Sequence, residues 1–292
     1  MELMTRIDIP KSEWKIGAEA RVLLVGSCFA DEVGQKMITG GLRAMVNPFG
    51  TLYNPASIAA SLLRSISERE YGGDAAELVR GEADGAWHSW MHHSRFSSTD
   101  KEALLTKMNR TMHEVAAFLR EADVLVVTLG TAIAYRLKET GMLVANCHKQ
   151  ADGLFVRECM TAYDIADQWQ MLLRLLESVN PKLRIVFTIS PIRHRRDGFH
   201  ANQVSKGILL QAVDALVRGA ADVCSYFPAY EIMLDELRDY RFYAADMVHP
   251  SEVAVEYIWQ RFQDTYFDNK TKDAAAKATK EWRRRQHRTI VK

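Results

Sequence analysis

A serine that directly follows an apolar stretch is the first candidate for chemistry in this sequence. Residues 21–25 read RVLLV and run into Gly26 and Ser27, after which a stretch with helical spacing begins. A hydroxyl placed there lies at the end of a strand, beside backbone N–H groups that open a helix and can stabilise an oxyanion. Serine also often serves as a plain helix cap. Ser27 alone therefore fits a nucleophile or a cap.

The partners that a serine nucleophile needs stand near the other end of the chain. Asp246 and His249 are three residues apart in DMVHPS, ahead of the amphipathic stretch 251–267. A serine hydroxyl is a weak nucleophile at neutral pH, so it needs a base, and the base needs a carboxylate to fix its tautomer. One short turn supplies both groups. The alternative is a surface Asp and His in the loop before a helix.

Two other kinds of chemistry are weaker candidates. Cys28 is a rival nucleophile, because a helix N-terminus lowers the pKa of a thiol. Its side chain should point about 100° around the helix from Ser27, toward packing, so we expect a buried thiol. The histidines at 92, 93 and 148 invite a zinc site, but HxH and HExxH spacings are missing. We therefore predict no metal and no cofactor.

Longer segments resemble a known family over roughly residues 20 to 265. GSCFA at 26–30 is the naming motif of the GSCFA family. The resemblance continues through NPFGTLYNP at 47–55, TLGT at 128–131, NCH at 146–148, SPIRH at 190–194, NQVSK at 202–206 and DMVHPS at 246–251. That family is similar to the SGNH (GDSL-like) hydrolases, whose pattern is a strand-end Ser, a Gly, a GxND block and a closing DxxH. The resemblance implies Ser27 as nucleophile, His249 as base and Asp246 as its carboxylate.

The oxyanion hole is where the sequence departs from the SGNH pattern. The resemblance implies the backbone amides of Ser27 and Gly50 as donors. After the apolar stretch 123–128 the sequence reads LGTAI, so the expected Asn side chain is absent. We favour the Thr131 hydroxyl as its replacement by position. The alternative is that Thr131 only starts a hairpin and that the two backbone amides form the hole.

Further polar side chains are candidates for substrate binding. They are Asn47, Asn54, His148, Arg193, His194 and Lys206. The amide of Asn47 or Asn54 is also an alternative oxyanion donor. Arg193 or Lys206 could hold an anionic group of the substrate, or could belong to a solvated basic loop. Two stretches of irregular pattern, 82–98 and 132–156, read as loops and hairpins that build the substrate site.

The elements that must position these residues follow an α/β pattern. Apolar runs alternate with amphipathic stretches, which is typical of a parallel sheet covered by helices on both faces. The predicted strands are 21–25, 42–46, 123–128, 184–189 and 223–227, and the predicted helices are 29–38, 56–68, 100–120, 162–178, 202–218 and 251–267. We predict a three-layer α/β/α sandwich with a mostly parallel five-stranded sheet, of SGNH-hydrolase or flavodoxin-like type, with hairpin and loop insertions.

The composition is that of an ordinary globular protein. The 292 residues are 48% hydrophobic and 26% charged, with a net charge of +1, so no nucleic-acid partner is expected. We predict one hydrolase domain over 1–267 and a basic tail over 268–292, which carries nine Lys or Arg against three acidic residues. The tail reads as a solvated helix with a frayed end, or as a contact for an anionic partner. The sequence contains no signal peptide or apolar membrane span, so we expect a cytoplasmic location. It leaves the oligomeric state open.

These observations predict a serine acyl esterase. The resemblance implies a small acyl group, such as acetyl, on a carbohydrate or cell-envelope precursor. Two alternatives remain at this point. One is an O-acyltransferase with the same triad, and the other is a non-catalytic module that binds a glycan or peptide on the same fold.

Overall fold

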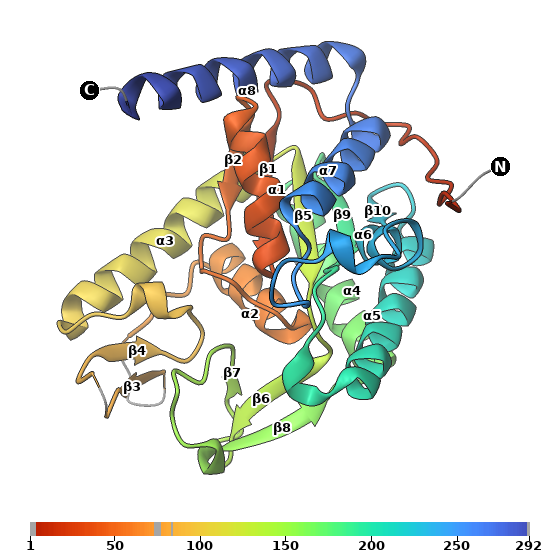
Figure 1. Cartoon of the computed structure of the whole chain (residues 1–292). Coiled ribbons are helices and arrows are strands. Elements are labelled where there is room, and N and C mark those ends of the chain that lie inside the picture. The colour runs from red at the N-terminus through yellow and green to blue at the C-terminus, as the bar shows by residue number, and fades with distance from the viewer. Residues whose placement is uncertain (1–3, 73–76, 83, 291–292) are drawn as a thin grey trace.

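The computed structural model describes residues 4–72, 77–82 and 84–290. Position 83 of the irregular stretch 82–98 and positions 291–292 of the basic tail lie outside the described residues. The centre of the fold is one parallel five-stranded sheet with the order β10-β9-β5-β1-β2 (Figure 1). Its strands are β1 (Arg21–Gly26), β2 (Arg43–Val46), β5 (Val124–Leu129), β9 (Arg184–Ile189) and β10 (Cys224–Phe227).

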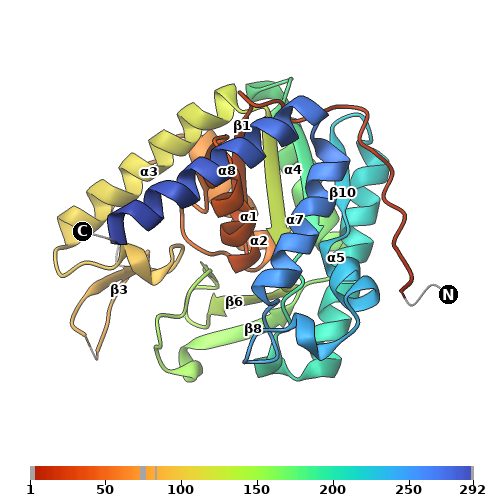
Figure 2. The same cartoon turned by 45° about the horizontal axis from the view of Figure 1, so that its top comes forward.

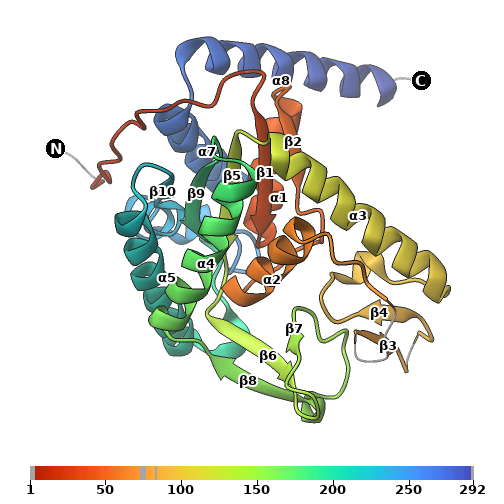
Figure 3. The same cartoon turned by 180° about the vertical axis from the view of Figure 1, so that it is seen from behind.

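Helices cover both faces of this sheet. On one face lie α1 (Cys28–Thr39), α6 (Ala229–Glu231) and α7 (Glu252–Tyr266), which pack on Val22 and Leu24 (Figure 2). Leu23 and Val25 face the other side, because successive side chains of a strand alternate. The helices there are α2 (Pro55–Ile66), α3 (Lys101–Glu121), α4 (Ala162–Val179) and α5 (Phe199–Gly219), shown in Figure 3. The predicted three-layer sandwich is confirmed.

Two insertions form separate small sheets beside the carboxyl edge of the central sheet. One contains β3 (Leu78–Arg80) and β4 (Trp87–Ser89), followed by a turn of 3-10 helix at Ser94–Phe96. The other is an antiparallel sheet of β6 (Ile133–Leu137), β7 (Leu143–Val144) and β8 (Phe155–Cys159), with a 3-10 turn at Asp152–Leu154. The backbone amides of Ala145 and Asn146 donate to the carbonyl of Trp90, so the insertions are joined to each other. The predicted hairpins are confirmed.

Outside the two insertions, three further short helical turns were not predicted from the sequence. A π-helical turn at Ile232–Glu236 continues α6, and 3-10 turns form at Arg195–Asp197 and Tyr240–Phe242. They are too short for a helical hydrophobic period to be visible in the sequence. The second and third lie on either side of the site described below, in the loops that follow β9 and precede α7.

The basic tail forms a single helix, α8 (Asn269–Ile290), which crosses the end of α1 (Figure 2). Its first half packs on the protein: Ala275 is buried, and Ala275 and Ala278 approach Gly40 and Gly41 at the end of α1. Side chains 280–286 are exposed. In the described part of the chain, no helix is both long and apolar enough to cross a membrane.

Candidate active site

Ser27 lies at the turn from β1 into α1. Gly26 has φ of +137°, and a Cβ there would lie 2.1 Å from the carbonyl oxygen of Thr128 on β5, so only glycine fits. Ser27 is the first residue before α1, yet its side chain makes no capping hydrogen bond. Its Oγ is buried and has no hydrogen-bond partner among the described residues. The hydroxyl is therefore not used as a helix cap.

The close approach at Gly26 gives a stability prediction. Gly26→Ala should lower the unfolding free energy by about 3 kcal/mol or more, because the methyl group clashes with β5 and the backbone torsion is strained. Gly17→Ala is the matched control, since a Cβ at Gly17 meets nothing within 4 Å. Urea unfolding measures both. Equal stability of the two variants would contradict the described turn.

Asn47 holds the backbone on both sides of this turn. Its Oδ1 accepts from the Gly26 N–H at 2.8 Å, and its Nδ2 donates to the Ser27 carbonyl at 3.4 Å. The side-chain amide that we expected to bind substrate or an oxyanion is thus used inside the protein. Asn54 is likewise occupied, because its Oδ1 accepts from the Ser57 N–H at 2.8 Å and caps α2. In this structure the side chain of Asn47 holds the backbone of the turn at Ser27, and the side chain of Asn54 holds the backbone at the start of α2.

Asp246 and His249 form the expected pair. The His249 Nδ1 and the Asp246 Oδ2 are 2.5 Å apart, which leaves Nε2 as the nitrogen available to a substrate or to serine. The other carboxylate oxygen accepts from the backbone N–H groups of His249 and Val248, each at 2.9 Å. Hydrogen bonds from these two amides, together with the imidazole, hold the pKa of Asp246 well below its usual range. The carboxylate therefore stays charged at neutral pH.

The Asp246–His249 pair and Ser27 belong to the same edge of the sheet. Ser27 follows β1, and the loop after the parallel strand β9 carries Arg193, whose N–H donates to the Val248 carbonyl at 3.3 Å. Parallel strands place such loops at one edge. No hydrogen bond joins Ser27 to His249 within the described residues. Ser27 is 1% exposed, whereas the His249 side chain is 49% exposed.

Arg193 and His148 also have roles within the protein. The Arg193 guanidinium donates to the Met247 carbonyl and lies 4.5 Å from the centre of the Tyr243 ring, so it holds the loop of His249. His148 lies in the second insertion, where its Nε2 is 2.7 Å from the Ser89 carbonyl. The structure thus uses Arg193 to position the Asp246–His249 loop.

The three predicted oxyanion donors all have other partners. The Ser27 N–H donates to the Thr128 carbonyl at 3.0 Å, and the Gly50 N–H donates to the Asn47 carbonyl at 2.7 Å. The Thr131 hydroxyl lies 3.1 Å from the Ser205 hydroxyl and accepts from the Ile133 N–H at the start of β6. Thr131 therefore starts the hairpin, as in the alternative interpretation. No oxyanion hole is assembled from these donors in this structure.

One face of α5 holds the ends of β5 and β9 together. Lys206 is buried, and its Nζ donates to the carbonyls of Gly130 and Ser190, both at 2.7 Å. Ser205 Oγ accepts from the Ala132 N–H, and Asn202 Oδ1 accepts from the His194 N–H. Burial lowers the pKa of Lys206 to about 7. Lys206 is thus neither in a solvated loop nor free to bind an anion.

Cys28 is an unreactive neighbour of Ser27. It is partly buried, and burial together with the nearby Asp31 raises the pKa of its thiol to about 11. Since the thiolate is the nucleophile, Cys28 is protonated and poorly reactive at neutral pH. The part of the chain that the structure describes contains no group of three or more His, Cys, Asp or Glu side chains that could hold a metal ion.

His92 is a buried histidine in the first insertion, and it makes stability depend on pH. Its Nδ1 lies 2.8 Å from the Ser89 hydroxyl, and burial lowers the pKa of His92 to about 3 from 6.5. Below pH 6.5 the unfolded chain takes up a proton that the folded chain rejects, so stability falls. We expect His92→Gln to remove about 2 kcal/mol of the loss between pH 7 and pH 5, measured by urea unfolding. An unchanged pH dependence would contradict this.

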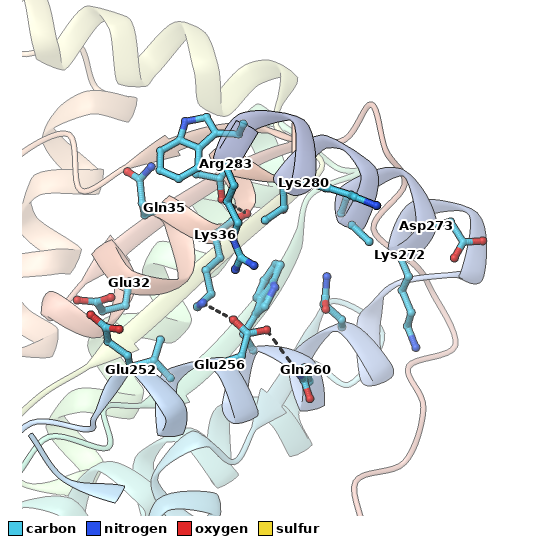
Figure 4. A pocket seen from close by; sticks show the side chains of 18 of the residues that line it. Glu32, Gln35, Lys36, Glu252, Glu256, Gln260, Lys272, Asp273, Lys280 and Arg283 are labelled. Carbon is cyan, nitrogen blue, oxygen red and sulfur yellow. Dashed lines mark hydrogen bonds and ion pairs between the residues drawn. The ribbon is translucent and has the colours of Figure 1, made fainter. Parts of the chain in front are cut away.

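A groove lies at the opposite end of α1, between α1, α7 and α8 (Figure 4). Its volume is about 890 Å³, and an ion pair between Lys36 and Glu256, with 2.5 Å between Nζ and Oε2, crosses it. The side chains that line it are mixed in charge. Glu32 on α1 and Glu252 on α7 are acidic, whereas Lys280 and Arg283 on α8 are basic (Figure 4). None of the predicted site residues lines this groove.

The chain is similar to one protein family and, more distantly, to solved structures. The model of the GSCFA family matches residues 21–262. No curated protein matches the sequence. Among solved structures, a Streptococcus pneumonia protein described as a candidate platelet activating factor aligns with a TM-score of 0.42 and 10% identity, over 84% of each chain. An acetyl xylan esterase from Butyrivibrio proteoclasticus aligns with a TM-score of 0.36 and 11% identity, over 85% of this chain and 64% of the esterase chain.

Proposed function

We propose that this chain, which belongs to the GSCFA family, is a serine hydrolase that cleaves acyl esters with Ser27 as its nucleophile. The observation that carries the proposal is the Asp246–His249 pair, whose Nδ1 and Oδ2 atoms are 2.5 Å apart. The loop of this pair is hydrogen-bonded to the loop after β9, at the edge of the sheet where Ser27 follows β1. A histidine held by a charged carboxylate is suited to take a proton from a hydroxyl. The Ser27 hydroxyl lies at that edge and makes no hydrogen bond to any described residue.

Ser27, His249 and Asp246 each have one role in the proposed reaction. His249 Nε2 removes the Ser27 proton while Oγ attacks the ester carbonyl, and Asp246 stabilises the imidazolium that forms. The imidazolium then protonates the leaving alcohol. Water, activated by the same imidazole, releases the acid from the acyl-enzyme. This scheme requires a rearrangement on substrate binding, because Ser27 is shielded and not yet bonded to His249. Catalytic hydrogen bonds often tighten only in the substrate complex.

The substrate class follows from the family resemblance. A small acyl group such as acetyl, carried by a carbohydrate or a cell-envelope precursor, is the proposed substrate. Acyl transfer to a sugar hydroxyl is the second candidate, and the 1% exposure of Ser27 favours it, since a transferase must keep water from the acyl-enzyme. The two activities use the same three side chains.

Turnover of p-nitrophenyl acetate by the full chain tests the proposal. A hydrolase releases nitrophenol and free acetate in equal amounts, whereas a transferase forms acetylated sugar when a methyl glycoside is added. Both outcomes support an acyl-enzyme intermediate, and the loss of both in Ser27→Ala would assign it to Ser27. If neither nitrophenol nor an initial burst is released across acetyl, propionyl and butyryl esters, the protein is better described as a binding module.

A further inference from the structure

The oxyanion donors predicted from the sequence do not provide a free side-chain donor for the proposed reaction. An ester attacked by Ser27 places negative charge on its carbonyl oxygen, which needs hydrogen-bond donors in the transition state. The amides of Ser27 and Gly50 and the hydroxyl of Thr131 already have partners inside the protein. Both Asn47 and Asn54 hold backbone. A donor that is not yet committed must come from elsewhere at this edge of the sheet.

His194 carries a suitable uncommitted atom. It lies in the loop after β9, the strand that pairs with β5 through Leu129 and Ile189. Its Nε2 is buried beside the backbone of Gly130 and makes no hydrogen bond of acceptable geometry among the described residues. A buried polar atom without a partner costs about 1 to 3 kcal/mol, so such an atom calls for an explanation. Ser27 Oγ, at the end of β1, is also buried without a hydrogen-bond partner among the described residues. In the sheet, β1 is separated from β9 by β5 alone.

The space beside this nitrogen is kept open by Gly130. A Cβ on Gly130 would lie 3.3 Å from His194 Nε2 and 3.0 Å from the Tyr53 carbonyl. Gly130 does not have a positive φ, so the backbone alone does not demand glycine here. The glycine instead leaves room between β5 and the imidazole.

The imidazole is positioned and kept neutral. The Asn202 Oδ1 accepts a hydrogen bond from the backbone N–H of His194 at 2.9 Å, and the Tyr53 ring lies edge-on to the imidazole at 5.9 Å between ring centres. Burial, with the nearby Lys206 ammonium, lowers the pKa of His194 to about 4. A neutral imidazole offers one N–H as a donor and does not compete with His249 as base. The preceding residue, Arg193, holds the His249 loop, so one loop positions both histidines.

We infer that His194 donates its Nε2–H to the oxyanion formed during acyl transfer to Ser27, in the role of the absent Asn amide. This inference rests on the proposed function. Ser27 Oγ bonds to the acyl carbon while the carbonyl electron pair moves to the oxygen that His194 binds, and the Oγ proton passes to His249. When that electron pair returns, the bond to the alcohol breaks, and the alcohol takes the proton from His249.

Variants at position 194 test the inference with p-nitrophenyl acetate as substrate. His194→Ala should lower kcat about 10²-fold to 10³-fold with KM nearly unchanged, since the interaction exists only in the transition state. His194→Gln keeps an N–H donor of similar reach and should recover at least tenfold of that loss. His200→Ala, an exposed histidine on α5, is the matched control and should keep wild-type kcat.

A boronic acid separates the oxyanion role from a structural one. Methylboronic acid forms a tetrahedral adduct on a serine nucleophile, and its affinity should fall in His194→Ala by about the same factor as kcat/KM. Wild-type kcat in His194→Ala, or a loss of kcat with unchanged boronate affinity, would overturn the inference. If His194→Ala does not fold, the fold-changes in kcat/KM and in boronate affinity are compared in His194→Gln instead, and unequal changes there would overturn the inference. Failure of the wild-type protein to turn over any ester would instead overturn the proposed function.

Discussion

Ser27→Ala should lower the turnover of p-nitrophenyl acetate by about 10⁴-fold or more, because the covalent route through an acyl-enzyme is lost. Only one oxygen atom is removed, and that atom makes no hydrogen bond to any residue that the structure describes. The variant should therefore fold and even gain about 1 kcal/mol of unfolding free energy, since a buried hydroxyl without a partner is costly. A lost activity combined with a gained stability is typical of a functional residue.

Cys28→Ala is the matched control for that substitution. The two residues are adjacent, but burial raises the pKa of the Cys28 thiol to about 11, so it carries almost no thiolate at pH 7. Cys28→Ala should keep kcat within about threefold of the wild-type value. The reverse pattern, with Ser27→Ala active and Cys28→Ala inactive, would make the protein a cysteine enzyme and would contradict the assignment of Ser27.

His249→Ala should lower kcat by about 10³-fold or more, because the base that takes the Ser27 proton in the proposed reaction is lost. His194 is a poor substitute, since its pKa of about 4 makes it a weak acceptor of the serine proton. Added imidazole should restore part of the activity of His249→Ala, because the missing ring leaves space for it. Steady-state kinetics with and without imidazole measure both effects.

Asp246→Asn tests the carboxylate in the same series. An amide cannot stabilise the imidazolium and favours the wrong tautomer of His249, so kcat should fall by about 10⁴-fold. The pKa of Asp246 lies well below its usual range, so protonation of this carboxyl should not cause an acid limb in the wild-type pH profile between pH 5 and pH 8. Wild-type activity in both His249→Ala and Asp246→Asn would show that the pair has no catalytic role.

The fold was predictable because its signal is local. Strand β9 lies at 184–189 as predicted, β1 ends one residue later than predicted, and β5 begins and ends one residue later than predicted. Continuous apolar runs of this length are expected where a strand is buried on both faces. Helix starts followed cap residues, as with Asp100 before α3. The earlier start of α5, at Phe199, follows from Gly198, whose φ is +82°.

The partners of the site residues were not predictable, because each is set by contacts between distant segments. Lys206 donates to a carbonyl 76 residues away, and Asn47 holds a turn 21 residues away. Such pairings depend on strand register and on how α5 packs, which a residue pattern does not encode. The signal for His194 was present in SPIRH, but its place beside Gly130 follows only from the pairing of β5 with β9.

The central claim is that Ser27 is an activated nucleophile, and covalent labelling of the native chain tests it most directly. A fluorophosphonate should modify one residue, and peptide mass spectrometry should find the adduct on Ser27. The label should be absent from Ser27→Ala and from heat-denatured protein, and retained in Cys28→Ala. A wild-type protein that stays unlabelled, or an adduct on any other residue, would contradict the claim.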